Sequence, residues 1–228
     1  MASEPGRCLG LIGGLGPGAT IHYYRELIAA NEAQGRVARL LIAHADINRV
    51  YAAVGAKDFT GLARYLAGLI ESMAAGGAEL TAMVAVTPHI CSAELVALSP
   101  LPLIDMVAEV AEAVRARSLK RVALLGTRFT IETRMFGRLG DVEVIMPRPD
   151  EIDQIHNAYV DIVGGRGSAA QVDNVRKLAH NFIARDGAEA VLLAGTDFSL
   201  VFNESNIDFP TIDCARVHID AIMRRLLG

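Results

Sequence analysis

Short apolar runs alternate along this chain with longer stretches in which apolar residues recur at helical spacing. The short runs are predicted strands and lie at 9–12, 39–43, 80–85, 103–104, 121–125, 142–146, 190–194 and 209–212. The helical pattern covers 21–32, 59–75, 106–116, 171–186 and 215–227. The stretch 44–51, after the second strand, is predicted to be a loop. Because strands alternate with helices, the pattern predicts an α/β fold whose parallel sheets carry helices on both faces.

The α/β pattern occurs twice along the chain. The triplet Gly-Ala-Glu precedes one strand at 77–79 and another at 187–189, which is 110 positions later. The segments "LIGG" from Leu11 and "LLGT" from Leu124 are 113 positions apart. Such a triplet is also common before strands in general, but the agreement in element order favours a true repeat. We therefore predict two pseudo-symmetric domains, residues 1–98 plus 213–228 and residues 99–212.

Composition and charge exclude several classes of protein. The 228 residues are 52% hydrophobic and 21% charged, which is typical of a globular protein. A net charge of −4 gives no reason to expect nucleic acid or an acidic membrane surface as a partner. No apolar run reaches the roughly 18 residues of a membrane span, and no signal peptide is recognisable, so we expect a cytoplasmic protein. Three cysteines without CxxC spacing, and histidines without HxH or HExxH spacing, predict neither a disulfide framework nor a metal site.

The predicted strand ends carry the candidate chemistry. Ligands of open α/β sheets bind beyond the carboxyl ends of the strands, so the loops after residues 12, 43, 85, 125 and 194 are expected to face one cleft between the domains. The first of these loops, "GGLGPGAT", resembles a dinucleotide fingerprint, but the acid expected about 20 residues on is absent, and Asp46 comes later. A tight turn that exposes backbone N–H groups at a helix N-terminus is favoured, and it would suit a carboxylate as well as a phosphate.

Several polar residues near the strand ends are candidates for binding or proton transfer. Arg49 is either a clamp for a substrate carboxylate or a surface arginine. Thr127 and Thr130 are expected to cap a helix, which is compatible with anion binding there. Asp197, paired with His89 or Thr87, is the best acid–base candidate, although each residue alone is also explained by a structural role.

Five segments give the chain a resemblance to the aspartate/glutamate racemase family over nearly its whole length. They are "IGGLGPGATIHYY" (12–24), "VTPH" (86–89), "VALLGTRFT" (122–130), "AGTD" (194–197) and "PTIDCARVH" (210–218). The resemblance implies two pseudo-symmetric α/β domains with the site in the cleft between them, no cofactor, an amino acid or dicarboxylic acid as substrate, and a homodimer. It also implies substrate contacts at Gly13, Gly14, Arg49, Thr127, Thr130 and Thr196.

The resemblance fails at the two positions that carry the family's chemistry. Members use two cysteines on opposite faces of the substrate, one as base and one as acid. The family patterns C-N-T-x-H and G-C-T-E read here Ala85-Val86-Thr87-Pro88-His89 and Ala194-Gly195-Thr196-Asp197. Ala85 and Gly195 therefore stand at the cysteine positions. A methyl group and a hydrogen atom cannot carry protons, so a two-thiol mechanism is excluded.

Two classes of function fit this sequence. The first is an isomerase-like enzyme, independent of pyridoxal phosphate, in which Asp197 with His89 or Thr87 catalyses racemisation, isomerisation, decarboxylation or elimination on a small carboxylic acid. The second is a catalytically inactive homologue that binds a small acidic ligand. An engineered loss of the cysteines is a third possibility, but Val86 and Asp197 also depart from the pattern, which favours natural divergence.

Overall fold

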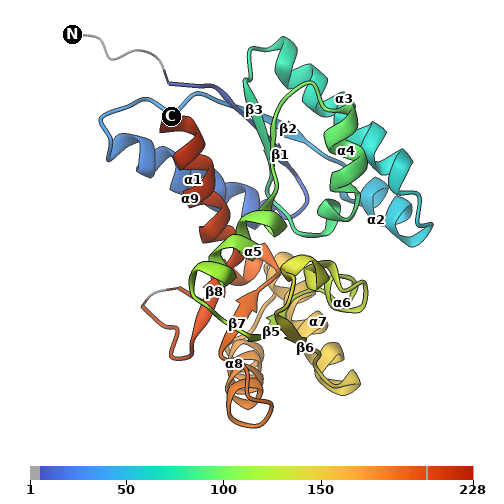
Figure 1. Cartoon of the computed structure of the whole chain (residues 1–228), viewed down its shortest axis with the longest axis vertical. Helices are drawn as coiled ribbons and strands as arrows, with labels where there is room; N and C mark the ends of the chain where they lie inside the picture. The colour runs from blue at the N-terminus through green and yellow to red at the C-terminus, as the bar shows by residue number, and fades with distance from the viewer. Residues whose placement is uncertain (1–5, 204, 228) are drawn as a thin grey trace. The chain divides into compact units, whose positions relative to one another are not determined.

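The computed structural model describes residues 6–203 and 205–227 of the chain, and Figure 1 traces them. The strands are β1 (Leu9–Gly13), β2 (Leu40–His44), β3 (Leu80–Met83), β4 (Leu103–Ile104), β5 (Arg121–Leu125), β6 (Glu143–Ile145), β7 (Ala190–Leu193) and β8 (Thr211–Asp213). The α-helices are α1 (Pro17–Glu32), α2 (Ile47–Gly55), α3 (Phe59–Ala75), α4 (Ser92–Leu98), α5 (Met106–Ala116), α6 (Arg128–Glu132), α7 (Pro149–Val163), α8 (Ala169–Ala184) and α9 (Cys214–Leu227). Three short 3₁₀ helices are η1 (Thr87–Cys91), η2 (Met135–Leu139) and η3 (Thr196–Leu200).

The strands form two parallel four-stranded sheets with the same topology. Their orders are β2-β1-β3-β4 and β6-β5-β7-β8. The chain divides into two compact units, Met1–Met106 with His218–Gly228 and Val107–Val217. Because β4 pairs with β3, it lies in the first unit, beyond the domain boundary predicted at 98/99. The predicted fold class, α/β with parallel sheets and flanking helices, is confirmed.

The repeated Gly-Ala-Glu triplet makes the same contacts in both units. The backbone N–H of Glu79 donates to the Cys8 carbonyl at 2.8 Å, and its carboxylate accepts from the Cys8 N–H at 2.9 Å. The Glu189 N–H donates to the Arg121 carbonyl at 2.9 Å, and its carboxylate accepts from the Arg121 N–H at 2.9 Å. Each glutamate thus ties the entry of one strand to the neighbouring strand, which explains why the triplet recurs.

Helices cover both faces of the first sheet. Figure 1 shows α1 and α9 on one face, and α2, α3 and α4 on the other. The α3 helix has the predicted bounds because Asp58 caps it, accepting the Gly61 N–H at 2.8 Å, and because its apolar residues recur at helical spacing. Those buried residues are Leu62, Ala63, Leu66, Ala67, Ile70 and Met73.

The prediction of a loop over 44–51 is wrong, because α2 begins at Ile47. Asp46 caps this helix by accepting the Asn48 N–H at 2.9 Å, and Val50 and Val54 are buried one turn apart. The short length of α2 hid its periodicity.

The α7 helix is absent from the predicted elements. Many of its residues are polar, but Ile155, Tyr159 and Ile162 are buried and contribute to the core of the second unit. Among the described residues, no helix is both long enough and apolar enough to cross a membrane.

Candidate functional site

The glycine-rich turn after β1 is built by close backbone packing. Gly14 has a φ of +82°, and a Cβ there would lie 2.7 Å from the Ala45 carbonyl oxygen. A Cβ on Gly13 would lie 3.1 Å from the Thr20 hydroxyl oxygen. The Gly14 N–H donates to that same Thr20 hydroxyl at 3.1 Å. The two glycines are therefore required by the turn itself, and their predicted contact with substrate stays a prediction.

The end of β3 carries Ala85, Thr87 and His89. Ala85 is buried and ends in a methyl group, and Thr87 is half-buried at the start of η1. His89 is buried, and its Nε2 accepts the Met106 N–H at 3.1 Å. Its Nδ1 lies 3.0 Å from the Ala85 carbonyl oxygen and therefore carries the proton, because a carbonyl can only accept. Both ring nitrogens of a neutral imidazole are thus bonded to the backbone of the first unit.

The repeat supports a structural role for His89. Ser199 lies 110 positions later in η3, and its hydroxyl donates to the Asp213 carboxylate at 2.8 Å. Asp213 in turn accepts the Ala215 N–H at 2.8 Å, at the start of α9. His89 and Ser199 thus occupy equivalent positions, and each connects a 3₁₀ helix by hydrogen bonds to the start of the α-helix that follows the fourth strand of its sheet. This pattern favours His89 as a support for the start of α5.

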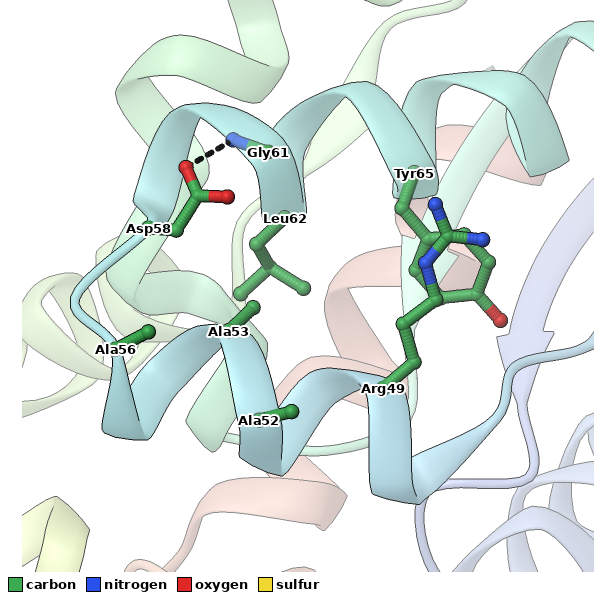
Figure 2. A pocket seen from close by; sticks show the side chains of 8 residues that line it. All are labelled: Arg49, Ala52, Ala53, Ala56, Asp58, Gly61, Leu62 and Tyr65. Carbon is green, nitrogen blue, oxygen red and sulfur yellow. Dashed lines mark hydrogen bonds between the residues drawn. The ribbon is translucent and has the colours of Figure 1, made fainter.

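Arg49 lies on α2 rather than in a loop, and Figure 2 shows its guanidinium stacked on the ring of Tyr65 from α3. The guanidinium carbon is 4.1 Å from the ring centroid. The Tyr65 hydroxyl accepts the Asp46 N–H at 2.7 Å, which fixes the ring. Within the described chain, Arg49 forms no ion pair, so its charge is available to an anion. The groove beside it is lined by Ala52, Ala53, Ala56, Asp58, Gly61 and Leu62.

In the second unit, the neighbouring strands β5 and β7 end together. Leu125 pairs with Leu193, so Gly126 lies beside Ala194, and the segments that lead to Thr130 and to Asp197 both start at this edge of the sheet. Thr127 caps α6 as predicted, because its hydroxyl oxygen accepts the Thr130 N–H at 3.1 Å. The two hydroxyl oxygens are 2.9 Å apart. The two threonine hydroxyls therefore form a hydrogen bond with each other. Their capping role needs no substrate, and a contact with substrate would be a second role.

Gly195 lies against the ring of Tyr159. Its backbone is extended, with φ −124° and ψ 114°, a conformation open to any residue. A Cβ at this position would lie 2.8 Å from Cδ2 and 3.1 Å from Cζ of Tyr159. Tyr159 itself packs edge-to-face on Phe198, with ring centroids 5.2 Å apart. Glycine is therefore required at 195 by lack of space, not by its backbone angles.

Polar groups gather beside Gly195. The Tyr159 hydroxyl donates to Oδ2 of Asp197 at 3.1 Å, and Asp197 is 1% exposed. Thr196 is also 1% exposed, and its hydroxyl has no hydrogen-bond partner among the described residues. An unsatisfied buried hydroxyl costs free energy, so Thr196 Oγ1 is a candidate donor to a ligand or water. The end of β7 thus offers a carboxylate, a phenol and an unpaired hydroxyl.

Sequence reasoning missed Tyr159 and its neighbour His156, because α7 was not predicted. The two residues are three positions apart, so they lie on one face of that helix. His156 is half-buried, and burial, reinforced by the charge of Arg128, lowers its pKa. A polar and aromatic pair at helical spacing was the available signal.

The thiols take no part in these groups. Cys8, Cys91 and Cys214 are free and buried. Burial raises the pKa of Cys91 to about 12 and that of Cys214 well above its ordinary value. The described residues contain no cluster of three or more His, Cys, Asp or Glu side chains that could hold a metal ion.

The chain contains two parallel α/β units with the same topology, and each has a polar turn at the equivalent strand ends. It is therefore a two-domain α/β protein with an internal repeat. A family model described as Asp/Glu/Hydantoin racemase matches residues 12–222, and the chain belongs to that family.

Solved structures agree with this assignment. A proposed Asp/Glu racemase from Yersinia pestis is 25% identical with a TM-score of 0.85, covering 97% of this chain and 100% of its own. An aspartate racemase homologue from Pyrococcus horikoshii OT3 is 21% identical with a TM-score of 0.83, with coverage of 97% and 100%. The aspartate racemase from Picrophilus torridus is 20% identical with a TM-score of 0.75, with coverage of 97% and 94%. The last two likenesses concern the fold.

Proposed function

We propose that this chain is an isomerase-like enzyme that moves a proton at the α-carbon of a small carboxylic acid, using a carboxylate in place of thiols. The single observation that carries the proposal is the group at the end of β7. There Asp197 is buried, accepts from the Tyr159 hydroxyl, and directly follows Thr196, whose buried hydroxyl has no partner in the part of the chain that the structure describes. A group with an unsatisfied polar atom beside a carboxylate is suited to a polar ligand.

The proposed step is a proton transfer in which atoms and charge balance. The Asp197 carboxylate takes the proton from the substrate α-carbon and becomes a carboxylic acid, while the substrate becomes a planar enediolate. Return of a proton from the acid to the α-carbon restores the carboxylate. For a decarboxylation, Asp197 starts as the carboxylic acid: loss of CO₂ leaves a carbanion, the acid protonates it, and water then reprotonates the carboxylate. For an elimination, Asp197 keeps the α-proton while the leaving group departs, and the proton is then released to water. General acid–base catalysis by one positioned carboxylate contributes about 10²- to 10⁴-fold.

The remaining proposed contacts come from the residues predicted to bind substrate. Thr127, Thr130 and Thr196 lie at the ends of the adjacent strands β5 and β7 and would bind a carboxylate. Gly13, Gly14, Arg49 and Thr87 are the proposed contacts of the first unit. His89 is left out of the proton transfer, because both of its ring nitrogens are bonded to backbone atoms. A reaction without pyridoxal phosphate or another cofactor, in a cytoplasmic homodimer, belongs to the proposal as well.

The test is hydrogen exchange. The purified protein is incubated in D₂O with a panel of L- and D-amino acids and small dicarboxylic acids, and deuterium at the α-carbon and any product are measured. We expect exchange or product with at least one acid, and a loss of about 100-fold or more in Asp197→Asn. Asp208→Asn, which alters an exposed carboxylate, is the control. Full activity in Asp197→Asn would contradict the proposal, as would no exchange with any acid.

A ligand-binding protein without catalysis is the second candidate, and the absence of cysteine at 85 and 195 favours it. A dicarboxylic acid at about 100 times its Kd would raise the free energy of unfolding by about 2.7 kcal/mol. We expect Arg49→Ala and Thr127→Ala to reduce this stabilisation, and Thr127→Ser and the exposed Arg115→Ala to keep it. Ligand stabilisation without any exchange would select this candidate over the enzyme.

A further inference from the structure

Gly195 and Tyr159 occupy complementary space at the end of β7. The extended backbone of Gly195 would accept any residue, yet a Cβ there would press on the Tyr159 ring. Tyr159 is held in that place by Phe198, which packs on its ring edge-to-face, and by its hydrogen bond to Asp197. A side chain at 195 and the ring at 159 therefore exclude one another.

We infer that Tyr159 occupies the position of the second thiol without doing its chemistry. Its ring fills the space that a side chain at 195 would need, and its hydroxyl positions Asp197. The steric part of this inference stands on the geometry alone. The positioning part rests on the proposed function, because orienting Asp197 matters for catalysis only if Asp197 transfers a proton. Tyr159 is thus a positioning residue, and the glycine at 195 is its counterpart.

The chemistry of the side chain supports more than space filling. A phenylalanine would fill the same volume, whereas a buried phenol needs a hydrogen-bond partner to offset its desolvation. That partner is the buried Asp197 carboxylate, and the adjacent Thr196 hydroxyl has no partner within residues 6–203 and 205–227. The hydroxyls of Tyr159 and Thr196 and the Asp197 carboxylate therefore lie next to the position at which the family resemblance implies a cysteine. One consequence is that thiol chemistry cannot be restored by changing residue 195 alone.

The steric part is tested by a double-mutant cycle on the free energy of unfolding. Gly195→Cys, Tyr159→Ala and the double variant are unfolded by heat beside the unaltered protein. Overpacking is expected to lower the melting temperature of Gly195→Cys by about 5 °C, and this loss should vanish in the Tyr159→Ala background. If Tyr159→Ala does not fold, Tyr159→Val takes its place. Gly68→Cys, at an exposed helix position with open space around it, is the control.

A second readout uses the reactivity of the new thiol. In the double variant, Cys at 195 should react with iodoacetamide faster than the three buried natural cysteines, as measured by mass spectrometry. An equal loss of stability for Gly195→Cys with and without Tyr159 would overturn the steric replacement.

The positioning part is tested by Tyr159→Phe, which keeps the ring and removes only the hydroxyl. We expect kcat for α-carbon exchange to fall at least tenfold while KM and the melting temperature change little, because Asp197 loses its orienting donor. An unchanged kcat would overturn the positioning role. If the unaltered protein exchanges no acid at all, the proposed function and the positioning role both fall. The unfolding cycle still decides the steric replacement in that case.

Discussion

His218 Nδ1 lies 3.1 Å from the hydroxyl oxygen of Tyr23, and these two buried groups join α9 to α1 inside the first unit. The other ring nitrogen, Nε2, donates to the Ile104 carbonyl at 2.9 Å. The imidazole is therefore neutral, with Nδ1 as the acceptor from Tyr23. Burial lowers the pKa of His218 to about 3 from an ordinary value of 6.5.

This depressed pKa predicts that the first unit loses stability in mild acid. The unfolded chain binds a proton at His218 below about pH 6.5, whereas the folded chain does not until about pH 3. The contribution is complete above pH 6.5, and it is lost as the pH falls toward 3. The loss is at most about 1.4 kcal/mol per pH unit for one group.

Denaturant unfolding between pH 7.5 and 4 measures this effect. His218→Gln should be less stable at pH 7.5 but show a flatter dependence on pH. His44→Gln, at an exposed histidine, is the control and should keep the original slope. Identical slopes for His218→Gln and the unaltered protein would contradict the assignment of a neutral, buried imidazole.

The unpaired hydroxyl of Thr196 predicts an unusual sign for a core substitution. Thr196→Val removes a buried polar atom that has no partner among the residues described, and should leave stability unchanged or raise it by about 1 kcal/mol in the absence of ligand. The matched control is Thr81→Val, because the buried Thr81 hydroxyl donates to the Gly10 carbonyl at 3.1 Å. That change should cost about 1 kcal/mol.

Thermal unfolding of these two variants decides the point. Thr81→Val is expected to lower stability whereas Thr196→Val is not, and any stabilisation by a dicarboxylic acid should be lost in Thr196→Val alone. A clear destabilisation of Thr196→Val without ligand would mean that its hydroxyl is satisfied in solution, for example by water, and that no ligand is needed to explain it.

The fold could be predicted from sequence where local signals and burial agree. Asp58 is a helix N-cap residue directly before α3, and a Gly-Ala-Glu triplet directly precedes each of β3 and β7. These elements therefore begin where the sequence predicts them. The α7 helix could not be recognised in the same way. Its exposed face is acidic and amide-rich, and its buried residues find their partners only in the tertiary core.

The candidate site could be predicted from its sequence motifs, but the contacts of its residues could not. The residues at the ends of β5 and β7 follow from strand order, and the absence of thiols at 85 and 195 follows from the motif. The contact between Tyr159 and Asp197 joins residues 38 positions apart and depends on how α7 packs. The bonds of His89 likewise depend on Met106, which no local pattern connects with it.

The close packing of Gly14 in the turn after β1 predicts that alanine costs more stability there than at Gly35, which follows α1. Gly35 and Gly14 both have positive φ, of +67° and +82°, so alanine is strained at either position by about 1 kcal/mol. Gly35 has open space around a Cβ, whereas at Gly14 the Cβ would meet the Ala45 carbonyl at 2.7 Å. Gly14→Ala should therefore cost at least about 1 kcal/mol more than Gly35→Ala. Urea unfolding of both variants measures the difference, and equal costs would show that the turn relaxes freely.

The three natural thiols are predicted to be unreactive in the folded protein. With a pKa raised to about 12, Cys91 is almost wholly protonated at pH 8, and its Sγ donates to the Pro88 carbonyl at 3.2 Å. Cys214 is fully buried, and Cys8 is 6% exposed. Labelling with iodoacetamide at pH 8, followed by mass spectrometry, should modify none of them over an hour, and all three after unfolding in guanidinium. Cys91→Ala should keep any α-carbon exchange activity, because a protonated, buried thiol takes no part in proton transfer. Rapid labelling of Cys91 in the native state, or a loss of exchange in Cys91→Ala, would instead place a thiol back in the chemistry of this chain.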